Sequence, residues 1–165
     1  MGKISQQRRS LLLCDGGMRV EPFKEGYLIN LSRIRERARE IAPITASFMF
    51  DYQDGVYEYR IKNLYDSNFF YVTCPRLSEA EKNKDKTDWI LSKFIYTVVP
   101  MMHDITDIVL MANDSDFVPV VSFMKDLGKK VTLFCYKNPA ALYNSFLEKE
   151  DIIDISAFAL IGKPE

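Results

Sequence analysis

Residues 108–117, with the sequence IVLMANDSDF, decide how the rest of the chain is interpreted. The first five are apolar and partly β-branched, which is typical of a buried β-strand. Two carboxylates, Asp114 and Asp116, follow directly, and residues 117–127 then have the apolar pattern of a helix, with a proline in the first turn and a glycine after the last. In open α/β sheets, ligands bind just outside the carboxyl ends of the strands. Asp114 and Asp116 are therefore the first candidates for chemistry.

The rest of the chain alternates expected strands with expected helices. We expect strands at residues 10–15, 44–50, 69–74, 130–136 and 152–155, and helices at 22–41, 87–98 and 140–147. This alternation indicates βαβ units around a parallel sheet, and right-handed crossovers place helices on both of its faces. We predict one α/β domain over residues 1–165, with a three-layer α/β/α, Rossmann-like fold and a mainly parallel central sheet. Residues 1–9 are expected to be a basic N-terminal tail.

Composition narrows the class of protein. The chain is 47% hydrophobic and 27% charged, as in ordinary globular proteins, and no apolar run approaches the length of a membrane span. Its three cysteines are far apart and lack metal-ligand spacing, which favours a reducing, cytoplasmic setting. The net charge of −1 does not itself indicate a nucleic-acid binder, and the single histidine, His103, argues against a histidine-based metal site. A homo-oligomer is compatible with this composition.

Four aspartates are expected to meet at one edge of the sheet: Asp15, Asp88, Asp114 and Asp116. Asp15 closes the first strand, and Asp88 opens the helix at 87–98. Four carboxylates in one place repel one another, and a divalent cation relieves that repulsion. Ligands that are all oxygen select hard ions, Mg²⁺ or Mn²⁺, and such an ion can bind a phosphate oxygen and lower the pKa of a water molecule.

Each aspartate also has a purely structural interpretation. Asp114 can cap the following helix, Asp116 and Asp88 can favour a helix dipole from the first turn, and Asp15 can be a turn residue beside two glycines. The joint pattern favours the metal site, because a strand is followed by an aspartate in two places and one of them is an Asp-x-Asp pair.

Three motifs resemble the NYN domain, a family of PIN-like metal-dependent nucleases. They are DGG at 15–17, KTDW at 86–89, and NDSDFVP at 113–119 with GKKV at 128–131. The resemblance covers nearly the whole chain. It implies a parallel α/β/α sheet, an acidic pocket holding Mg²⁺ or Mn²⁺, and a ribonuclease that leaves a 5′-phosphate. On that resemblance, the four aspartates named above would be both the catalytic and the metal-binding acids.

The chain departs from the family pattern at three places. Met18 stands where family members commonly have an asparagine. Lys93 and Phe94 stand where a further aspartate is common, two turns into the helix that Asp88 opens. Asn113 replaces the usual glycine before the Asp-Ser-Asp sequence, a milder change because asparagine also tolerates the left-handed conformation. The pocket is therefore expected to have one acid fewer than is usual.

Contacts to the substrate are expected from the residues that flank the acids: Asn113, Ser115, Gly16, Gly17, Arg19 and Lys86. The glycines permit close approach of the backbone to a ligand, and the two cations can neutralise phosphates. For Lys86 the alternative is an ordinary solvated loop. Trp89 can stack on an unpaired base or pack in the core, and core packing is the favoured interpretation.

The leading hypothesis is a cytoplasmic Mg²⁺- or Mn²⁺-dependent endoribonuclease that acts on single-stranded or structured RNA. Two alternatives keep the same fold. One is a catalytically weak or inactive RNA-binding or regulatory domain, suggested by Met18 and the missing acid. The other is a hydrolase of small phosphate esters that uses the same aspartates.

Overall fold

The structure, a computed structural model, describes residues 6–52, 63–74 and 87–164. Its centre is a six-stranded sheet in the order β4-β3-β1-β5-β6-β7, in which all neighbouring strands are parallel. The strands are β1 (Ser10–Asp15), β3 (Ile44–Tyr52), β4 (Phe70–Cys74), β5 (Asp107–Met111), β6 (Lys130–Cys135) and β7 (Ile152–Asp154). The predicted parallel sheet is therefore confirmed.

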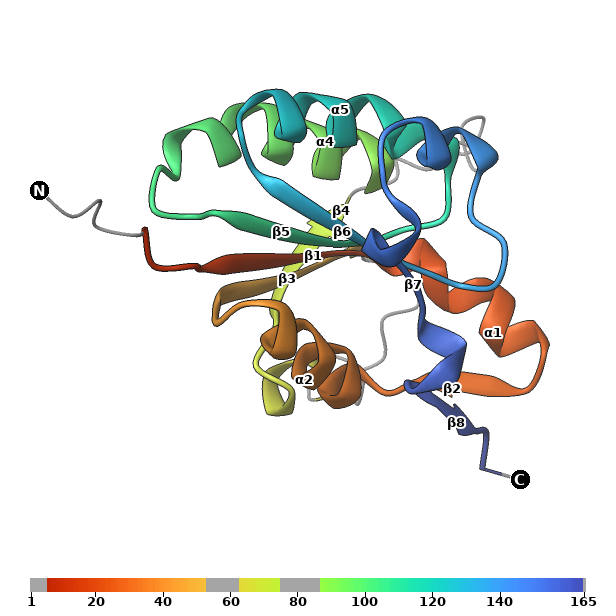
Figure 1. Cartoon of the computed structure of the whole chain (residues 1–165). Coiled ribbons are helices and arrows are strands. Elements are labelled where there is room, and N and C mark those ends of the chain that lie inside the picture. Colours follow the sequence, from red (N-terminus) through yellow and green to blue (C-terminus); the bar gives the residue numbers. More distant parts are fainter. Residues whose placement is uncertain (1–5, 53–62, 75–86, 165) are drawn as a thin grey trace, which may run out of the picture.

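Helices cover both faces of this sheet (Figure 1). On one face lie α4 (Thr87–Thr97) and α5 (Val118–Asp126), and on the other lies α2 (Leu31–Ile41). The short helix α1 (Val20–Lys24) follows the 3-10 turn η1 (Gly16–Arg19) at the end of β1. Further 3-10 turns are η3 (Val99–Met101), η4 (Ser115–Phe117), η5 (Ala141–Ser145), η6 (Lys149–Asp151) and η7 (Ile155–Ala157). The three-layer α/β/α architecture predicted from the sequence is confirmed.

The central strand β1 shows why the sheet forms two cores. All six of its residues are buried, as expected for a strand covered on both faces. Leu11 and Leu13 pack with α4 and α5, while Leu12 and Cys14 pack with Ile34 of α2. Successive side chains of a strand point to opposite faces, so one apolar run supplies both cores.

The single helix expected at residues 22–41 is wrong. The chain instead forms α1, the strand β2 (Tyr27–Ile29) and α2. Gly26 has a φ of +93°, which ends the first helix, and the Asn30 side chain accepts a hydrogen bond from the Arg33 amide and starts the second. β2 pairs antiparallel with β8 (Leu160–Gly162), a strand that the sequence did not predict.

Other boundaries differ by a few residues. The strand expected at 44–50 continues to Tyr52, and the helix expected at 140–147 is the 3-10 turn η5. Within the connection between β3 and β4, residues 63–66 are helical. Among the residues that the structure describes, no helix combines the length and the apolar character needed to cross a membrane.

Candidate functional site

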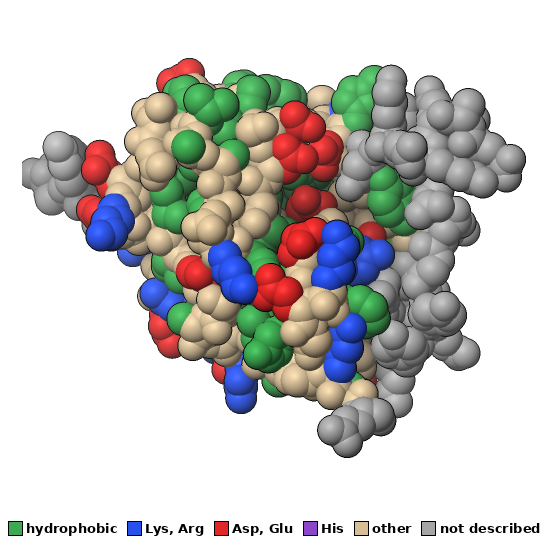
Figure 2. Space-filling view, turned by 90° about the vertical axis from the view of Figure 1, so that its right-hand side faces the viewer, with side chains coloured by type: hydrophobic (Ala, Val, Ile, Leu, Met, Phe, Trp, Pro, Cys, Tyr) green, Lys and Arg blue, Asp and Glu red, His purple; other side chains and the backbone are tan. Residues whose placement is uncertain are grey.

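The carboxyl ends of the central strands share one face of the molecule, shown in Figure 2. On that face, acidic side chains gather beside a hollow, with lysine and arginine side chains nearby. β1 ends there at Asp15, and its neighbour β5 leads into the turn that carries Asp114 and Asp116. The first turn of α4 brings Asp88 to the same edge.

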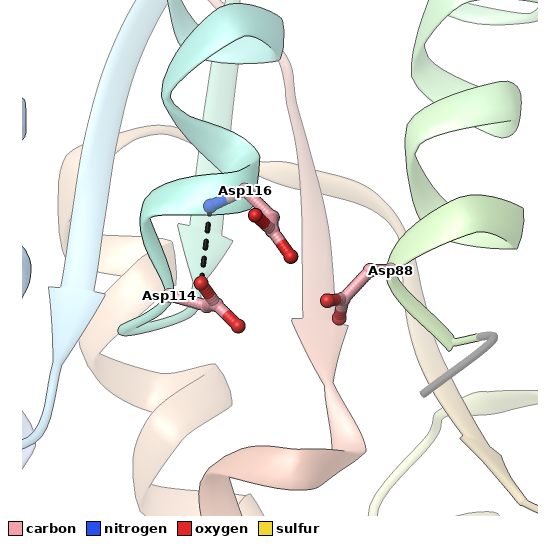
Figure 3. A group of neighbouring side chains, drawn as sticks. All are labelled: Asp88, Asp114 and Asp116. Carbon is pink, nitrogen blue, oxygen red and sulfur yellow. Dashed lines mark hydrogen bonds between the residues drawn. The ribbon is translucent and has the colours of Figure 1, made fainter. Parts of the chain in front are cut away.

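Three aspartates form a compact group, which we call the aspartate triad: Asp88, Asp114 and Asp116. Each offers one carboxylate oxygen, and these oxygens all lie within 4.8 Å of one another. The three carboxylates extend toward a common space from the start of α4 and from η4 (Figure 3). An all-oxygen donor set of this kind suits a hard divalent cation such as Mg²⁺ or Mn²⁺.

Backbone geometry orients Asp114. Its φ and ψ of −70° and 141° are those of extended chain, and its Oδ1 accepts a hydrogen bond of 3.1 Å from the Asp116 amide. Asp114 is therefore the N-cap of η4, as the structural interpretation of the sequence proposed. That hydrogen bond uses one carboxylate oxygen and limits the rotation of the side chain, while Asp114 and Asp116 both remain exposed to solvent.

Asp15 lies outside the aspartate triad. It is only 6% exposed, and its Oδ1 accepts a hydrogen bond of 2.9 Å from the Gly17 amide, which makes it the N-cap of η1. Asp15 is the last residue of β1, and Asp114 follows the neighbouring strand β5 by three residues; each caps a 3-10 turn through Oδ1. Of the four predicted acids, the structure brings Asp88, Asp114 and Asp116 close enough for their oxygens to share one metal ion. It places the fourth, Asp15, at the end of the neighbouring strand β1.

Tyr143 contacts the turn that carries Asp114. It is fully buried on η5, and its hydroxyl donates a hydrogen bond to the backbone carbonyl of Asp114. Burial raises the pKa of the Tyr143 hydroxyl, and the negative charges of the four aspartates raise it further, with Asp114 the largest and Asp15 next. A tyrosine in this field stays protonated and so remains a hydrogen-bond donor. Its stretch of sequence predicts only a short helix and gave no signal of this contact.

A second feature missed by the sequence analysis is Asp51. It lies near the carboxyl end of β3, is 5% exposed, and forms an ion pair of 2.7 Å with Arg19. Arg19 also donates a hydrogen bond of 2.8 Å to the carbonyl of Gly16, so it closes the loop after β1. A Cβ atom on Gly16 would lie 2.4 Å from Cγ of Asp51, which explains the glycine at this position. The same rule that selected Asp15, an aspartate at a strand end, would have selected Asp51.

The family of the chain follows from comparison with known proteins. Residues 9–154 match the family model described as the NYN domain. The chain belongs to the NYN domain family. The resemblance identified from the sequence motifs is thereby confirmed.

Two further comparisons complete this result. The crystal structure of a protein of unknown function from Vibrio parahaemolyticus RIMD 2210633 is similar, with a TM-score of 0.69 and 14% sequence identity, over 96% of this chain and 99% of that chain. At that identity the likeness concerns the fold alone. No curated protein matches the chain.

The departures of this NYN domain from the family pattern have clear structural counterparts. Met18 is 5% exposed and packs in the core on the α2 side of the sheet. The Phe94 ring packs on the rings of Phe48 and Phe50, at centroid distances of 5.1 and 5.5 Å, while Lys93 is exposed. None of these positions supplies another carboxylate to the aspartate triad.

The predicted substrate contacts of the NYN domain differ in how they are engaged. The Asn113 amide donates to the carbonyl of Tyr136 at 2.8 Å and accepts from its backbone N–H at 2.7 Å, so it ties the ends of β5 and β6 together. Ser115 is exposed within η4, and the Gly17 amide is bonded to Asp15. Lys86 lies outside the described residues. The roles of these residues as substrate contacts stay predictions.

Trp89 is 69% exposed. The core packing favoured for it from the sequence is therefore wrong. It lies in the first turn of α4, directly after Asp88, where the helix turns its apolar positions Leu91 and Ile95 toward the sheet and leaves Trp89 outside.

Proposed function

We propose that this NYN domain is a Mg²⁺- or Mn²⁺-dependent endoribonuclease that hydrolyses phosphodiester bonds of RNA. The observation that carries the proposal is the aspartate triad, with its three oxygens within 4.8 Å of one another at the carboxyl edge of a parallel sheet. Ligands bind at this edge in open α/β folds. Membership of a family of PIN-like nucleases supports the same activity. The three cysteines of the chain are buried and far apart in the sequence, which supports action in a reducing compartment such as the cytoplasm.

The donor chemistry of the site fits such an ion. Asp88, Asp114 and Asp116 offer only oxygen, and the exposure of Asp114 and Asp116 leaves room for water and a phosphate beside the ion. A bound divalent ion supplies Lewis-acid chemistry, because it stabilises negative charge on a phosphate oxygen and lowers the pKa of a bound water. Asp15, buried at the neighbouring strand end, adds negative charge to the same region.

The protein contributes positioning. The Asp116 amide fixes one oxygen of Asp114, and the Tyr143 hydroxyl holds the carbonyl of Asp114 from the buried side. Because both contacts form when the chain folds, the Asp114 carboxylate does not have to be ordered when the ion and the RNA bind. Preorganised electrostatic groups of this kind usually supply the largest part of a catalytic effect.

The proposal is tested by incubating end-labelled RNA with the purified protein and Mn²⁺. The wild type should cleave the RNA and leave 5′-phosphate ends, and Asp114→Asn should reduce the rate on the order of 10²-fold or more. Asparagine caps helices as well as aspartate does, so the fold should be kept while the charge is lost. Asp104→Asn, an exposed aspartate before the amino end of β5, is the matched control and should cleave like the wild type.

Three other outcomes would contradict the proposal. Equal cleavage by Asp114→Asn would remove the aspartate triad from the mechanism. RNA binding without cleavage in Mn²⁺ would favour the RNA-binding or regulatory domain. Turnover of a small chromogenic phosphate ester in place of RNA would favour the small-ester hydrolase.

A further inference from the structure

A cavity of about 570 Å³ opens at the carboxyl end of β1, where Asp15 and Gly16 line it, and none of the aspartate triad is among its lining residues. Asp15 and Gly16 line one end of it, and from there it extends along α1 and β2 to the start of α2 and the helical turn at residues 63–66. Its volume falls within the range of sites that bind small molecules. Nothing in the function proposed above uses it.

The walls of the cavity suit a flat, largely apolar group. Met49, Leu64 and Met111 are buried apolar side chains that line it. Phe23 and Tyr27 line it as well, although they are 50% and 42% exposed. The Lys163 ammonium lies 3.3 Å from the centroid of the Phe23 ring and holds the ring in place. Exposed aromatic side chains at the wall of a cavity are the surfaces on which unpaired bases pack in RNA-binding proteins.

The charges of the lining argue against a phosphate in this cavity. Three carboxylates line it, Asp15, Asp51 and Asp66, against two cations, Arg19 and Lys24. Arg19 is already paired with Asp51 at 2.7 Å, and Lys24 is paired at 2.9 Å with a glutamate one helical turn away. A lining with excess negative charge repels an anion but accepts hydrogen bonds from hydroxyl and amino groups. An uncharged group that is rich in such donors is the matching ligand.

One polar side chain of the lining, Asn30, also offers a hydrogen-bond donor. Asn30 uses its Oδ1 to accept from the Arg33 amide at 3.2 Å, and in the described part of the chain its side-chain nitrogen has no partner. The cavity therefore offers carboxylate acceptors at its Asp15 end and an amide donor near the start of α2. This combination matches the edge of a base, which carries both donors and acceptors.

We propose that the cavity binds the base and ribose of one unpaired nucleotide of the RNA, while the adjoining phosphate lies at the aspartate triad. This inference rests on the proposed function. Asp15 relates the two places, since it lines the cavity and is the last residue of β1, the neighbour of β5, which leads into the turn that carries Asp114 and Asp116. The cavity holds the uncharged base and ribose. The aspartate triad, together with an ion, holds the charged phosphate.

The test uses nucleosides in EDTA, so that no divalent ion contributes. Adenosine, uridine and their 5′-monophosphates are titrated into the full chain, and binding is followed by NMR chemical shifts. Nucleosides should bind at least as tightly as their monophosphates, because the lining repels a phosphate. Phe23→Ala should weaken nucleoside binding on the order of fivefold or more. Ser67→Trp, which places an indole in the lining, should weaken it as well.

Tyr65→Ala is the matched control, since Tyr65 is a 68% exposed aromatic residue outside the lining. It should bind nucleosides like the wild type. Circular dichroism and the thermal midpoint of each variant establish that it is folded. The cavity assignment is overturned if nucleosides do not bind to the folded wild type, if monophosphates bind more tightly in EDTA, or if Phe23→Ala and Tyr65→Ala behave alike.

Failure of this inference and failure of the ribonuclease proposal give different results. Asp114→Asn should lose RNA cleavage in Mn²⁺ and keep nucleoside binding in EDTA. Cleavage by a wild type that binds no nucleoside would overturn the cavity assignment alone. Nucleoside binding with the expected variant pattern, but without cleavage in Mn²⁺, would overturn the ribonuclease proposal and leave the cavity as a nucleoside site.

Discussion

Replacing Asp116 by asparagine should stabilise the protein in EDTA and weaken its response to Mn²⁺. Two unit charges 4.8 Å apart repel by about 1 kcal/mol at the dielectric constant of water and by about 3.5 kcal/mol at an effective value of 20. Because Asp114 and Asp116 are exposed, the lower figure applies, and Asp116→Asn removes two such pairs. Removing the two repulsions raises the free energy of unfolding by about 2 kcal/mol. From this is subtracted about 0.3–1 kcal/mol, because the variant loses a favourable negative charge in the first turn of η4.

The net gain in the free energy of unfolding is therefore about 1–2 kcal/mol in EDTA, and each kcal/mol raises the thermal midpoint by about 2–4 °C for a chain of this size. In Mn²⁺ the order should reverse. An ion that binds only the folded state adds a stabilisation that grows with the logarithm of its concentration divided by its Kd, so the wild type, which binds more tightly, gains more. Asp104→Asn is the control and should change stability by less than about 0.5 kcal/mol in either buffer. Thermal unfolding followed by circular dichroism measures the wild type and both variants in each of the two buffers, six combinations in all.

The reasoning is refuted if Asp116→Asn is less stable than the wild type in EDTA. In that case the three carboxylates do not repel one another as their spacing requires. It is also refuted if Mn²⁺ stabilises the variant as strongly as the wild type, because Asp116 would then contribute nothing to the ion site.

Three other predictions concern the surroundings of the site. Tyr143→Phe removes the buried donor to the carbonyl of Asp114 and should cost about 1–3 kcal/mol in the free energy of unfolding by urea, together with a lower affinity for Mn²⁺ measured by calorimetry. Gly16→Ala should cost about 1–3 kcal/mol, because its Cβ would overlap the Asp51 carboxylate, and an equally stable variant would contradict that contact. Hydrogen bonds from a lysine and a tyrosine after β6 lower the pKa of Glu25 below its ordinary value of 4.5. The ionised Glu25 therefore stabilises the folded state above pH 4.5, and this contribution is lost as the pH falls through the lowered pKa. Thermal midpoints measured between about pH 3 and 6 should fall less steeply with pH in Glu25→Gln than in the wild type.

The parallel sheet and the carboxyl edge were predictable because they depend on local pattern. The buried run of β1 and the Asp-x-Asp pair after β5 are readable in the sequence, and the rules of α/β folds place their ends together. Asp88 could be placed for the same reason, as the second residue of a helix with a clear apolar stripe.

Features that depend on remote partners were not predictable from the same patterns. The strand β2 exists because β8, about 130 residues later, pairs with it. Its own three residues, one exposed and two of intermediate burial, carry no strand signal. Tyr143 and Asp114 are 29 residues apart, and their hydrogen bond depends on how η5 folds back over the end of β5. The apolar spacing also predicted one helix over residues 22–41, because Gly26 and Asn30 interrupt that helical spacing only briefly.

The β2–β8 pair builds a part of the cavity wall from residues that lie beyond the NYN match. The NYN match ends at residue 154, whereas β8 lies beyond it and contributes Ile161 to the wall of the cavity. The aspartates thus lie within the matched residues, and part of the cavity wall lies beyond them. Because Ile161 is remote in sequence from the aspartates, we expect a substitution there to reshape the cavity wall without changing the aspartates themselves.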